Sequence, residues 1–250
     1  MRVHELWRYP VKSMLGERLD GAEVGPLGFE GDRRRAVLDA ETGVSLSAKR
    51  YAELLQCRAR TADGQVRIEF PDGSEVPADG PEAAELLSAL LDRRVLVRRA
   101  GSETVVRHEF PTEIATGAGE PFLHEPGLDA FFDRAPLHLI TRATLAEFAR
   151  RQPGSTFAPA RFRPNLLVET SGHGFVEDGW VGRTLRVGAA RCEVIDRKPR
   201  CVMTTHVQMD LPRDPGVLRT IAGTNGGQAG VELRTVERGT VRVGDPVSVV

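Results

Sequence analysis

One cysteine in the last quarter of the chain is the residue best placed in the sequence to do chemistry. Cys201 closes a polar, basic stretch that contains Arg197, Lys198 and Arg200. Nearby positive charge favours a thiolate over a thiol, and a thiolate attacks electrophiles or binds a soft metal. A free cysteine is, however, most often a small buried hydrophobe. Local chemistry leaves both interpretations open.

Basic residues elsewhere in the chain are candidates for binding an anion. Lys12 and Ser13 follow an expected strand at residues 3–9. Arg161 and Arg163 alternate about an aromatic residue, so an extended segment would place both guanidinium groups on one side. Each arginine could pair with a carboxylate, or the two could grip a phosphate together.

Composition limits the class of protein. The chain has 250 residues, of which 40% are hydrophobic and 28% charged, as expected for one large or two small globular domains. A formal net charge of −1 provides no global attraction to nucleic acid or to an anionic membrane. We therefore expect no nucleic-acid or membrane partner.

The cysteines and the N-terminus indicate a cytoplasmic setting. Three widely spaced cysteines do not form a secreted disulfide framework, and without a CxxC motif we expect no structural zinc or ferredoxin-type cluster. The first residues lack an apolar signal region, and no apolar run is long enough to span a membrane.

Short strand patterns separated by turns dominate the chain. Helices are expected at residues 81–91 and 143–151, the second with Thr141 as N-cap, and residues 101–126 are expected to be a long loop. The segment around Cys201 predicts a strand, a tight polar turn at residues 196–200 and a second strand.

These patterns predict a mainly β (α+β) fold. We expect two β-barrel-like lobes with a few short helices, rather than an alternating βαβ arrangement. The lobes are expected at residues 1–110 and 111–250.

Several motifs, taken in order, resemble those of the MOSC family. The motifs are Tyr9-Pro10-Val11-Lys12-Ser13, Gly31-Asp32-Arg33, Arg161-Phe162-Arg163-Pro164-Asn165, Glu177-Asp178-Gly179-Trp180, Arg200-Cys201 and Val243-Gly244-Asp245-Pro246-Val247. Their order and spacing are most similar to the branch with an N-terminal β-barrel domain, which includes the mitochondrial amidoxime-reducing component and bacterial relatives. The resemblance implies an N-terminal MOSC_N-like domain followed by a MOSC domain.

The resemblance also implies a molybdenum cofactor, that is, molybdenum on a molybdopterin dithiolene. Cys201 matches the family cysteine that ligates the metal and would be the catalytic residue. The residues that match the family's pterin and phosphate contacts are Lys12, Ser13, Arg33, Arg163 and Asn165. A soft thiolate suits a thiophilic metal, in agreement with the local chemistry.

The implied reaction is a two-electron reduction of a small N-hydroxylated or N-oxygenated compound. Electrons would come from a separate donor protein of the ferredoxin or flavoprotein-reductase type, and an acid must supply protons. Asp210 is a candidate for that acid by its proximity in sequence. Two alternatives stay open, namely a sulfur carrier that uses a Cys201 persulfide and a non-catalytic cofactor-binding protein.

The chain departs from the family pattern at three places. Arg34 stands where an aromatic residue is usual, and residues 206–210 differ from the mitochondrial members. Arg134-Ala135-Pro136 replaces small hydroxylated residues of a cofactor loop. These differences bear on substrate choice and on some cofactor contacts.

Overall fold

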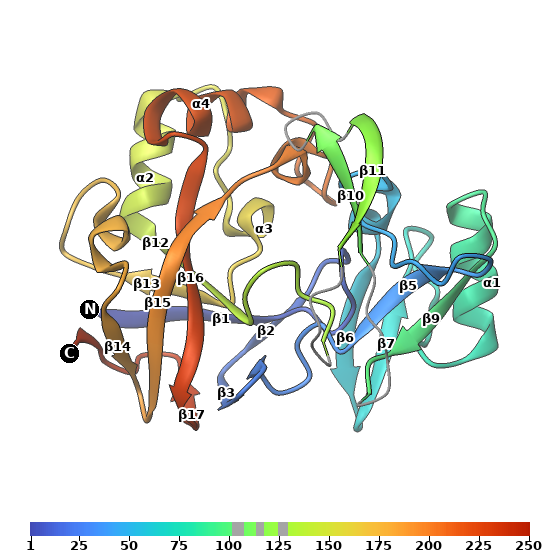
Figure 1. Ribbon diagram of the computed structural model, residues 1–250, viewed down its shortest axis with the longest axis horizontal. Helices are drawn as coiled ribbons and strands as arrows, with labels where there is room; N and C mark the ends of the chain where they lie inside the picture. Colours follow the sequence, from blue (N-terminus) through green and yellow to red (C-terminus); the bar gives the residue numbers. More distant parts are fainter. Residues whose placement is uncertain (102–107, 114–117, 125–129) are drawn as a thin grey trace.

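The largest sheet of the computed structural model gathers strands from both ends of the chain (Figure 1). The structure describes residues 1–101, 108–113, 118–124 and 130–250. In spatial order the strands of this sheet are β18 (Val247–Val249), β14 (Thr184–Val187), β15 (Ala190–Pro199), β16 (Gln228–Glu237), β12 (Leu137–Thr141), β13 (Leu166–Glu169), β1 (Arg2–Arg8) and β2 (Glu17–Leu19). Only β12 and β13 run parallel; the other neighbouring pairs are antiparallel.

Four smaller sheets complete the β structure. They are β17 (Gly239–Arg242) with β3 (Gly21–Gly25) and β4 (Gly28–Phe29), β5 (Arg35–Asp39) with β9 (Val95–Arg99), β6 (Arg58–Ala62) with β7 (Gln65–Glu69) and β8 (Glu75–Pro77), and β10 (His108–Glu113) with β11 (Ala118–His124). The predicted mainly β fold is confirmed. Within the described ranges the strand orders are open, and no sheet closes into a complete barrel.

Helices are few and short. They are α1 (Pro81–Leu90), α2 (Arg142–Arg151), α3 (Pro159–Phe162) and α4 (Pro215–Asn225), with 3₁₀ turns η1 (Ala52–Gln56), η2 (Val176–Trp180) and η3 (Val202–Thr205). The two predicted helices are confirmed as α1 and α2. The Thr141 hydroxyl caps α2 by accepting from the Thr144 amide at 3.1 Å, which satisfies a donor that the first turn leaves free.

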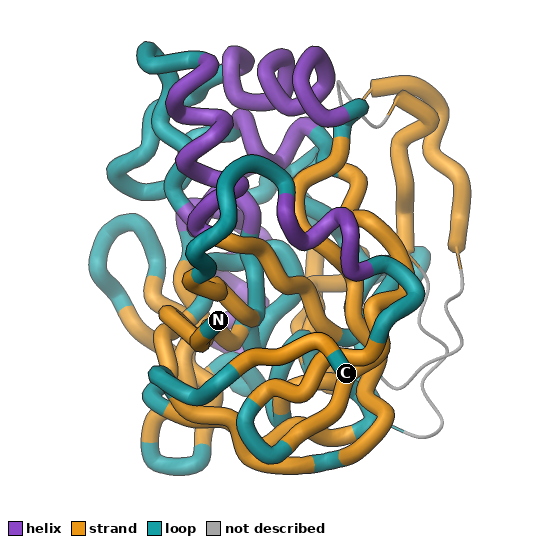
Figure 2. The backbone as a smooth tube through the Cα atoms, turned by 90° about the vertical axis from the view of Figure 1, so that its left-hand side faces the viewer, coloured by secondary structure: helices purple, strands orange, loops and turns teal. Residues whose placement is uncertain are grey.

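The two ends of the chain lie side by side, and α1 lies at the opposite end of the molecule (Figures 1 and 2). A bridge between Arg2 and Pro246 joins the two ends. The two largest apolar clusters are one built from residues 11–95 and one from the large sheet together with Val24, Phe29 and Val241. The first four strands, β1 to β4, lie in sheets that also contain strands from the end of the chain. The domain boundary expected near residue 110 remains a prediction.

The long loop predicted for residues 101–126 is wrong where the structure describes that segment. β10 and β11 pair in antiparallel register there, with Pro111 opposite Pro121. Proline cannot donate to a ladder and ordinarily argues against a strand, so these two residues hide the pattern in the sequence.

The first core cluster offers a test of the fold. Leu54 is fully buried in it, so Leu54→Ala removes apolar contacts and leaves a cavity, at a cost of about 2–5 kcal/mol in the free energy of unfolding. Val236→Ala is the matched control, because Val236 is 54% exposed and its truncation costs about 0.5 kcal/mol or less. Urea unfolding measures both variants, and equal losses would contradict this assignment of the core.

Candidate functional site

One pocket collects all the residues that the sequence singled out as cofactor contacts. Its cavity volume is about 180 Å³, whereas a single water needs only roughly 10–15 Å³, so the space suits a small molecule. The predicted residues that line it are Lys12, Ser13, Arg33, Arg163, Asn165 and Cys201. Residues that the motifs did not identify also line it, among them Lys49, Phe131, Asp133, Arg134, His138 and Met203.

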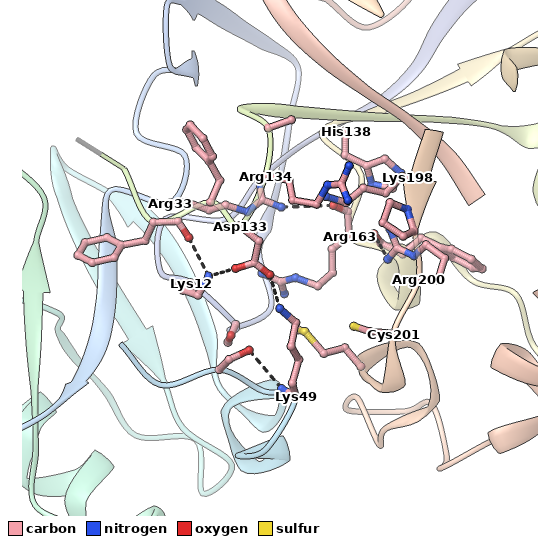
Figure 3. Close-up of a pocket in the computed structure, with 18 of the residues that line it drawn as sticks. Lys12, Arg33, Lys49, Asp133, Arg134, His138, Arg163, Lys198, Arg200 and Cys201 are labelled. Carbon is pink, nitrogen blue, oxygen red and sulfur yellow. Dashed lines mark hydrogen bonds and ion pairs between the residues drawn. The ribbon is translucent and has the colours of Figure 1, made fainter. Parts of the chain in front are cut away.

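Cys201 lies at the junction between β15 and η3, and its thiol points into the pocket (Figure 3). The tight turn predicted at residues 196–200 is wrong, because β15 continues through Pro199. The pairing of β15 with β16 is irregular between Val194 and Asp196 and again between Arg197 and Pro199. These irregularities let the strand carry basic residues up to the pocket wall. The strand predicted after Cys201 is instead the 3₁₀ turn η3.

The other two cysteines are unsuited to chemistry. Cys57 and Cys192 are buried in the two core clusters, and burial raises the pKa of each thiol to about 12. Both are therefore protonated thiols away from the pocket. Cys201 is partly exposed and is the one cysteine that lines it.

Arg163 and Arg200 bring positive charge into the pocket without a carboxylate partner among the described residues. Arg163 donates to the Met14 carbonyl, and Arg200 donates to the Phe162 carbonyl at 2.8 Å. Burial lowers the pKa of both guanidinium groups, that of Arg163 to about 10. The buried Nε of Arg200 has no hydrogen-bond partner within the described protein, so it is a donor that an anion in the pocket would satisfy.

Arg33 and Asn165 connect the pocket to the large sheet. Arg33 pairs with the buried Asp32 and donates to the Asn165 side-chain oxygen at 3.3 Å. Asn165 also accepts from the His138 amide at 3.1 Å and donates to the Trp7 carbonyl at 3.2 Å. Asn165 therefore ties β1, β12 and Arg33 together, and its amide is already engaged within the protein.

The Tyr9 ring contacts two of the site arginines. The guanidinium carbon of Arg33 lies 4.9 Å from the ring centroid, and that of Arg163 lies 4.3 Å from it. The Tyr9 hydroxyl donates to the Pro164 carbonyl at 3.0 Å. An aromatic face attracts both cations, so the Tyr9 ring of the Tyr-Pro motif orients the two arginines.

Lys12 and Ser13, the first predicted cofactor contacts, already have partners within the protein. Lys12 is 6% exposed and donates to the Phe131 carbonyl at 3.1 Å and to Asp133. The Ser13 hydroxyl accepts from the Ala48 amide at 3.0 Å. Burial lowers the pKa of Lys12 to about 8, although Asp133 opposes that shift.

Three of the predicted residues share an unusual backbone conformation. Ser13, Arg33 and Arg163 have φ values of 68°, 48° and 54°, in the left-handed region that residues with a Cβ rarely adopt. Such conformations cost energy and persist where the surroundings enforce them, typically at functional sites. Asp63, Asp92 and Met209 share this conformation outside the pocket lining, so it accompanies the site without locating it.

An ion-pair network lies behind the pocket residues Lys198 and Arg134. Glu232 on β16 is 1% exposed and accepts from Lys198 at 2.7 Å and from Arg134 at 3.1 Å. Beside it His138 is buried, and burial among cations holds its pKa well below the ordinary value, so the imidazole is neutral at pH 7. No motif marked His138 or Glu232, because their roles arise from pairing of strands distant in sequence.

Arg161 does not share the environment predicted for it. Residues 159–162 form α3 rather than an extended segment, so Arg161 and Arg163 point to different places. Arg161 is fully buried and donates to four backbone carbonyls, those of Thr156, Thr204, His206 and Pro212, at 2.7–3.2 Å. It holds η3 and the following loop in place behind Cys201.

The predicted proton source is also in a different place. Asp210 is exposed and does not line the pocket, whereas Asp133 does. No group of three or more His, Cys, Asp or Glu residues in the described part of the chain is arranged to hold a metal. A metal here would therefore need ligands from a cofactor in addition to the Cys201 thiolate.

Among the described residues no helix has the length and apolarity to cross a membrane.

Two family models match the chain in succession. Residues 1–104 match the MOSC N-terminal beta barrel domain, and residues 127–248 match the MOSC domain. Together they leave only residues 105–126 and the last two residues unmatched, so the chain belongs to the MOSC-domain proteins, a family associated with binding of the molybdenum cofactor. The resemblance drawn from the motifs is confirmed.

Curated relatives include mitochondrial amidoxime reducing component 2 from Bos taurus, 26% identical over 235 residues, and from Homo sapiens, 25% identical over 226 residues. Each match covers 81% of this chain and 66% of the relative, so the chain spans just under two thirds of their length. Among solved structures, the YUAD protein from Bacillus subtilis is 12% identical to this chain, with a TM-score of 0.51. The superposition covers 98% of this chain and 93% of the YUAD chain. That likeness concerns the fold alone.

The environments of the three cysteines predict selective modification. Iodoacetamide at pH 8 is expected to alkylate Cys201 in the native protein and to leave Cys57 and Cys192 unmodified, because burial keeps those two thiols protonated and inaccessible. Peptide mass spectrometry identifies the modified residue, and Cys201→Ser is the control that should remain unlabelled. Rapid labelling of either buried cysteine before unfolding would contradict the assignment.

The contrast between Arg161 and Arg163 predicts opposite phenotypes. Arg161→Ala leaves buried carbonyls unpaired and is expected to lower the free energy of unfolding by about 2–4 kcal/mol. Arg163→Ala removes a buried cation that lacks a carboxylate partner, so it is expected to cost less stability but to reduce stabilisation by added phosphate. Urea unfolding with and without phosphate separates the two effects. The opposite ranking would show that Arg161 is the ligand-facing residue.

Proposed function

We propose that this protein is a molybdenum-cofactor-dependent reductase of small N-hydroxylated or N-oxygenated compounds, with Cys201 as the protein ligand to molybdenum. One observation carries the proposal: a free thiol and two arginines without carboxylate partners among the described residues face the same pocket. The family membership and the amidoxime-reducing relatives support it.

The residues present fit the proposed cofactor. A molybdopterin has a phosphate, which needs cations, and a dithiolene-bound metal, which accepts a soft thiolate. The pocket provides cationic side chains at Lys12, Arg33, Lys49, Arg134, Arg163, Lys198 and Arg200. The partnerless Nε of Arg200 is a donor that an anionic ligand would satisfy.

Different parts of the pocket serve different parts of the cofactor in this proposal. Arg163 and Arg200, with Arg33 beside them, hold negative charge. Lys12, Ser13 and Asn165 shape the same wall, since their side chains are anchored to protein groups. Cys201 provides the thiolate that retains the metal. The proposed cofactor contacts are therefore the six residues that the motifs identified, together with Arg200.

When bound, the cofactor would supply two-electron chemistry at its metal. Reduction of an N-hydroxyl compound consumes two electrons and two protons, breaks the N–O bond and releases the oxygen as water. The protein must orient the substrate and deliver protons. Asp133, 27% exposed in its side chain, connects solvent to the pocket and replaces Asp210 as the candidate proton carrier.

Electrons have to reach the pocket from outside. We propose a separate ferredoxin- or flavoprotein-type donor protein as the partner. The described residues provide no cysteine cluster for an electron-transfer centre. The three free cysteines agree with a reducing, cytoplasmic setting, which we propose for the protein.

Replacement of Cys201 tests the proposal directly. Protein from a host that makes the cofactor is expected to contain near-stoichiometric molybdenum and to reduce an amidoxime with a chemical electron donor. Cys201→Ser should lose at least ~100-fold in reductase activity and most of the metal, because the hydroxyl is a much poorer soft-metal ligand. Cys192→Ala is the control, since Cys192 lies in the core, and it should retain both properties.

Other outcomes identify the alternatives. Full activity with bound metal in Cys201→Ser would remove the ligand assignment. If wild-type protein contained no molybdenum but carried a persulfide on Cys201, the result would support a sulfur carrier in place of the reductase. Bound cofactor without turnover by any donor would leave a cofactor-binding protein.

A further inference from the structure

A buried histidine in the pocket wall has one ring nitrogen without a partner. His138 on β12 is 3% exposed and lines the pocket together with Lys198 and Arg200 (Figure 3). Its Nε2 lies 3.3 Å from the Ala229 carbonyl. A carbonyl oxygen only accepts hydrogen bonds, so Nε2 carries the proton of the neutral ring. Nδ1 is buried and has no hydrogen-bond partner within the described protein, which leaves a bare basic nitrogen at the pocket.

The pairing of β12 with β16 holds the ring in this orientation. Gly230 on β16 has a φ of 81°, and a Cβ at that position would lie 2.4 Å from His138 Nε2, closer than a real side chain approaches. A glycine there makes room for the imidazole. Glu232 is the residue opposite His138 in the register, and its carboxylate accepts from Lys198 and Arg134. The nearest carboxylate in the sheet is therefore engaged by cations rather than by the ring.

The surroundings of His138 oppose its protonation. Burial is the largest cause of its low pKa, and the charges of Arg200, Lys198 and Arg33 lower the pKa further. The Arg163 backbone acts in the opposite sense and favours the protonated ring. An anion among these cations would cancel part of the charge that repels a proton from the imidazole. The proton affinity of His138 should therefore rise when the pocket is occupied.

We infer that His138 takes up a proton from solvent when an anion occupies the pocket, so that ligand binding and protonation of Nδ1 are coupled. One N–H bond forms at Nδ1, and no other covalent bond changes. Since the ring binds its proton more tightly in the occupied pocket, the affinity for the anion must increase as the pH falls through the interval between the two pKa values of His138.

The coupling has a consequence for the reaction. Reduction of an N-hydroxyl compound consumes two protons, and a protonated His138 would hold one of them in the wall of the loaded pocket. This consequence rests on the proposed function. The coupling itself can be measured with neither molybdenum nor turnover.

Sulfate is the probe, because it is a dianion near neutral pH and supplies no proton. Calorimetric titration of cofactor-free protein in buffers of different ionisation enthalpy counts the protons taken up. At about pH 6.5, where Lys12 with its pKa of about 8 is already protonated, we expect wild type to take up at least about 0.3 proton per bound sulfate. His138→Gln should lose this uptake.

His206→Gln is the matched control. His206 also has a buried ring nitrogen without a partner within the described protein, and burial lowers its pKa as well. It does not line the pocket, however, so this variant should take up as many protons as wild type does.

A second measurement covers the case in which His138→Gln does not fold. NMR follows the titration of the His138 ring in the wild-type protein, with the ring signals assigned through their bonds to the backbone. Saturating sulfate is expected to raise the pKa of His138 by about one pH unit or more, because it offsets the neighbouring cations. Arg200→Gln removes one of those cations and should raise the same pKa without sulfate.

Several results would overturn the inference. They are the absence of sulfate binding, sulfate binding without proton uptake, uptake that persists in His138→Gln or disappears in His206→Gln, and a His138 titration that neither sulfate nor Arg200→Gln shifts. A protein that shows the coupling but acquires no molybdenum would count against the proposed function and not against the coupling.

Discussion

Buried positive charge is the constraint on which the rest of this pocket depends. Arg163 is buried and Arg200 is partly buried, neither forms an ion pair with a carboxylate among the described residues, and burial lowers the pKa of both. Nearby acidic groups, Asp32 and Asp133 for Arg163 and Glu232 for Arg200, offset this cost only in part. Burying a charge is costly unless it is compensated, so these guanidinium groups favour a bound anion. The arrangement suits a protein that binds an anion better than it serves to stabilise a fold.

The fold supplies the framework that holds these charges together. The strand β1 enters the large sheet between β13 and β2 and ends next to the pocket, so it brings Tyr9 and Lys12 to residues from the second half of the chain. Both Arg33 and Arg163 then contact the Tyr9 ring. Because contacts from distant segments determine these positions, the backbone tolerates left-handed conformations there.

Sequence motifs identified the pocket but not its internal pairing. Cys201 and Arg163 were found because motifs of a known family carry them and because their chemistry suits a thiophilic metal and a phosphate. Arg161 was misplaced because an alternating pattern looks the same in a short helix turn as in an extended segment of this length. Asp133 and Glu232 were missed because their partners lie far away in sequence, at Lys49 and Lys198, where no local pattern records the contact.

The most direct test of the central claim is to locate the metal itself. Crystals of protein purified from a host that makes the cofactor can be measured at the molybdenum absorption edge, where anomalous scattering identifies the atom. The proposal predicts a single strong peak within bonding distance of the Cys201 sulfur, with phosphate density among Arg33, Arg163 and Arg200. A peak away from Cys201, or phosphate density outside the pocket, would contradict it.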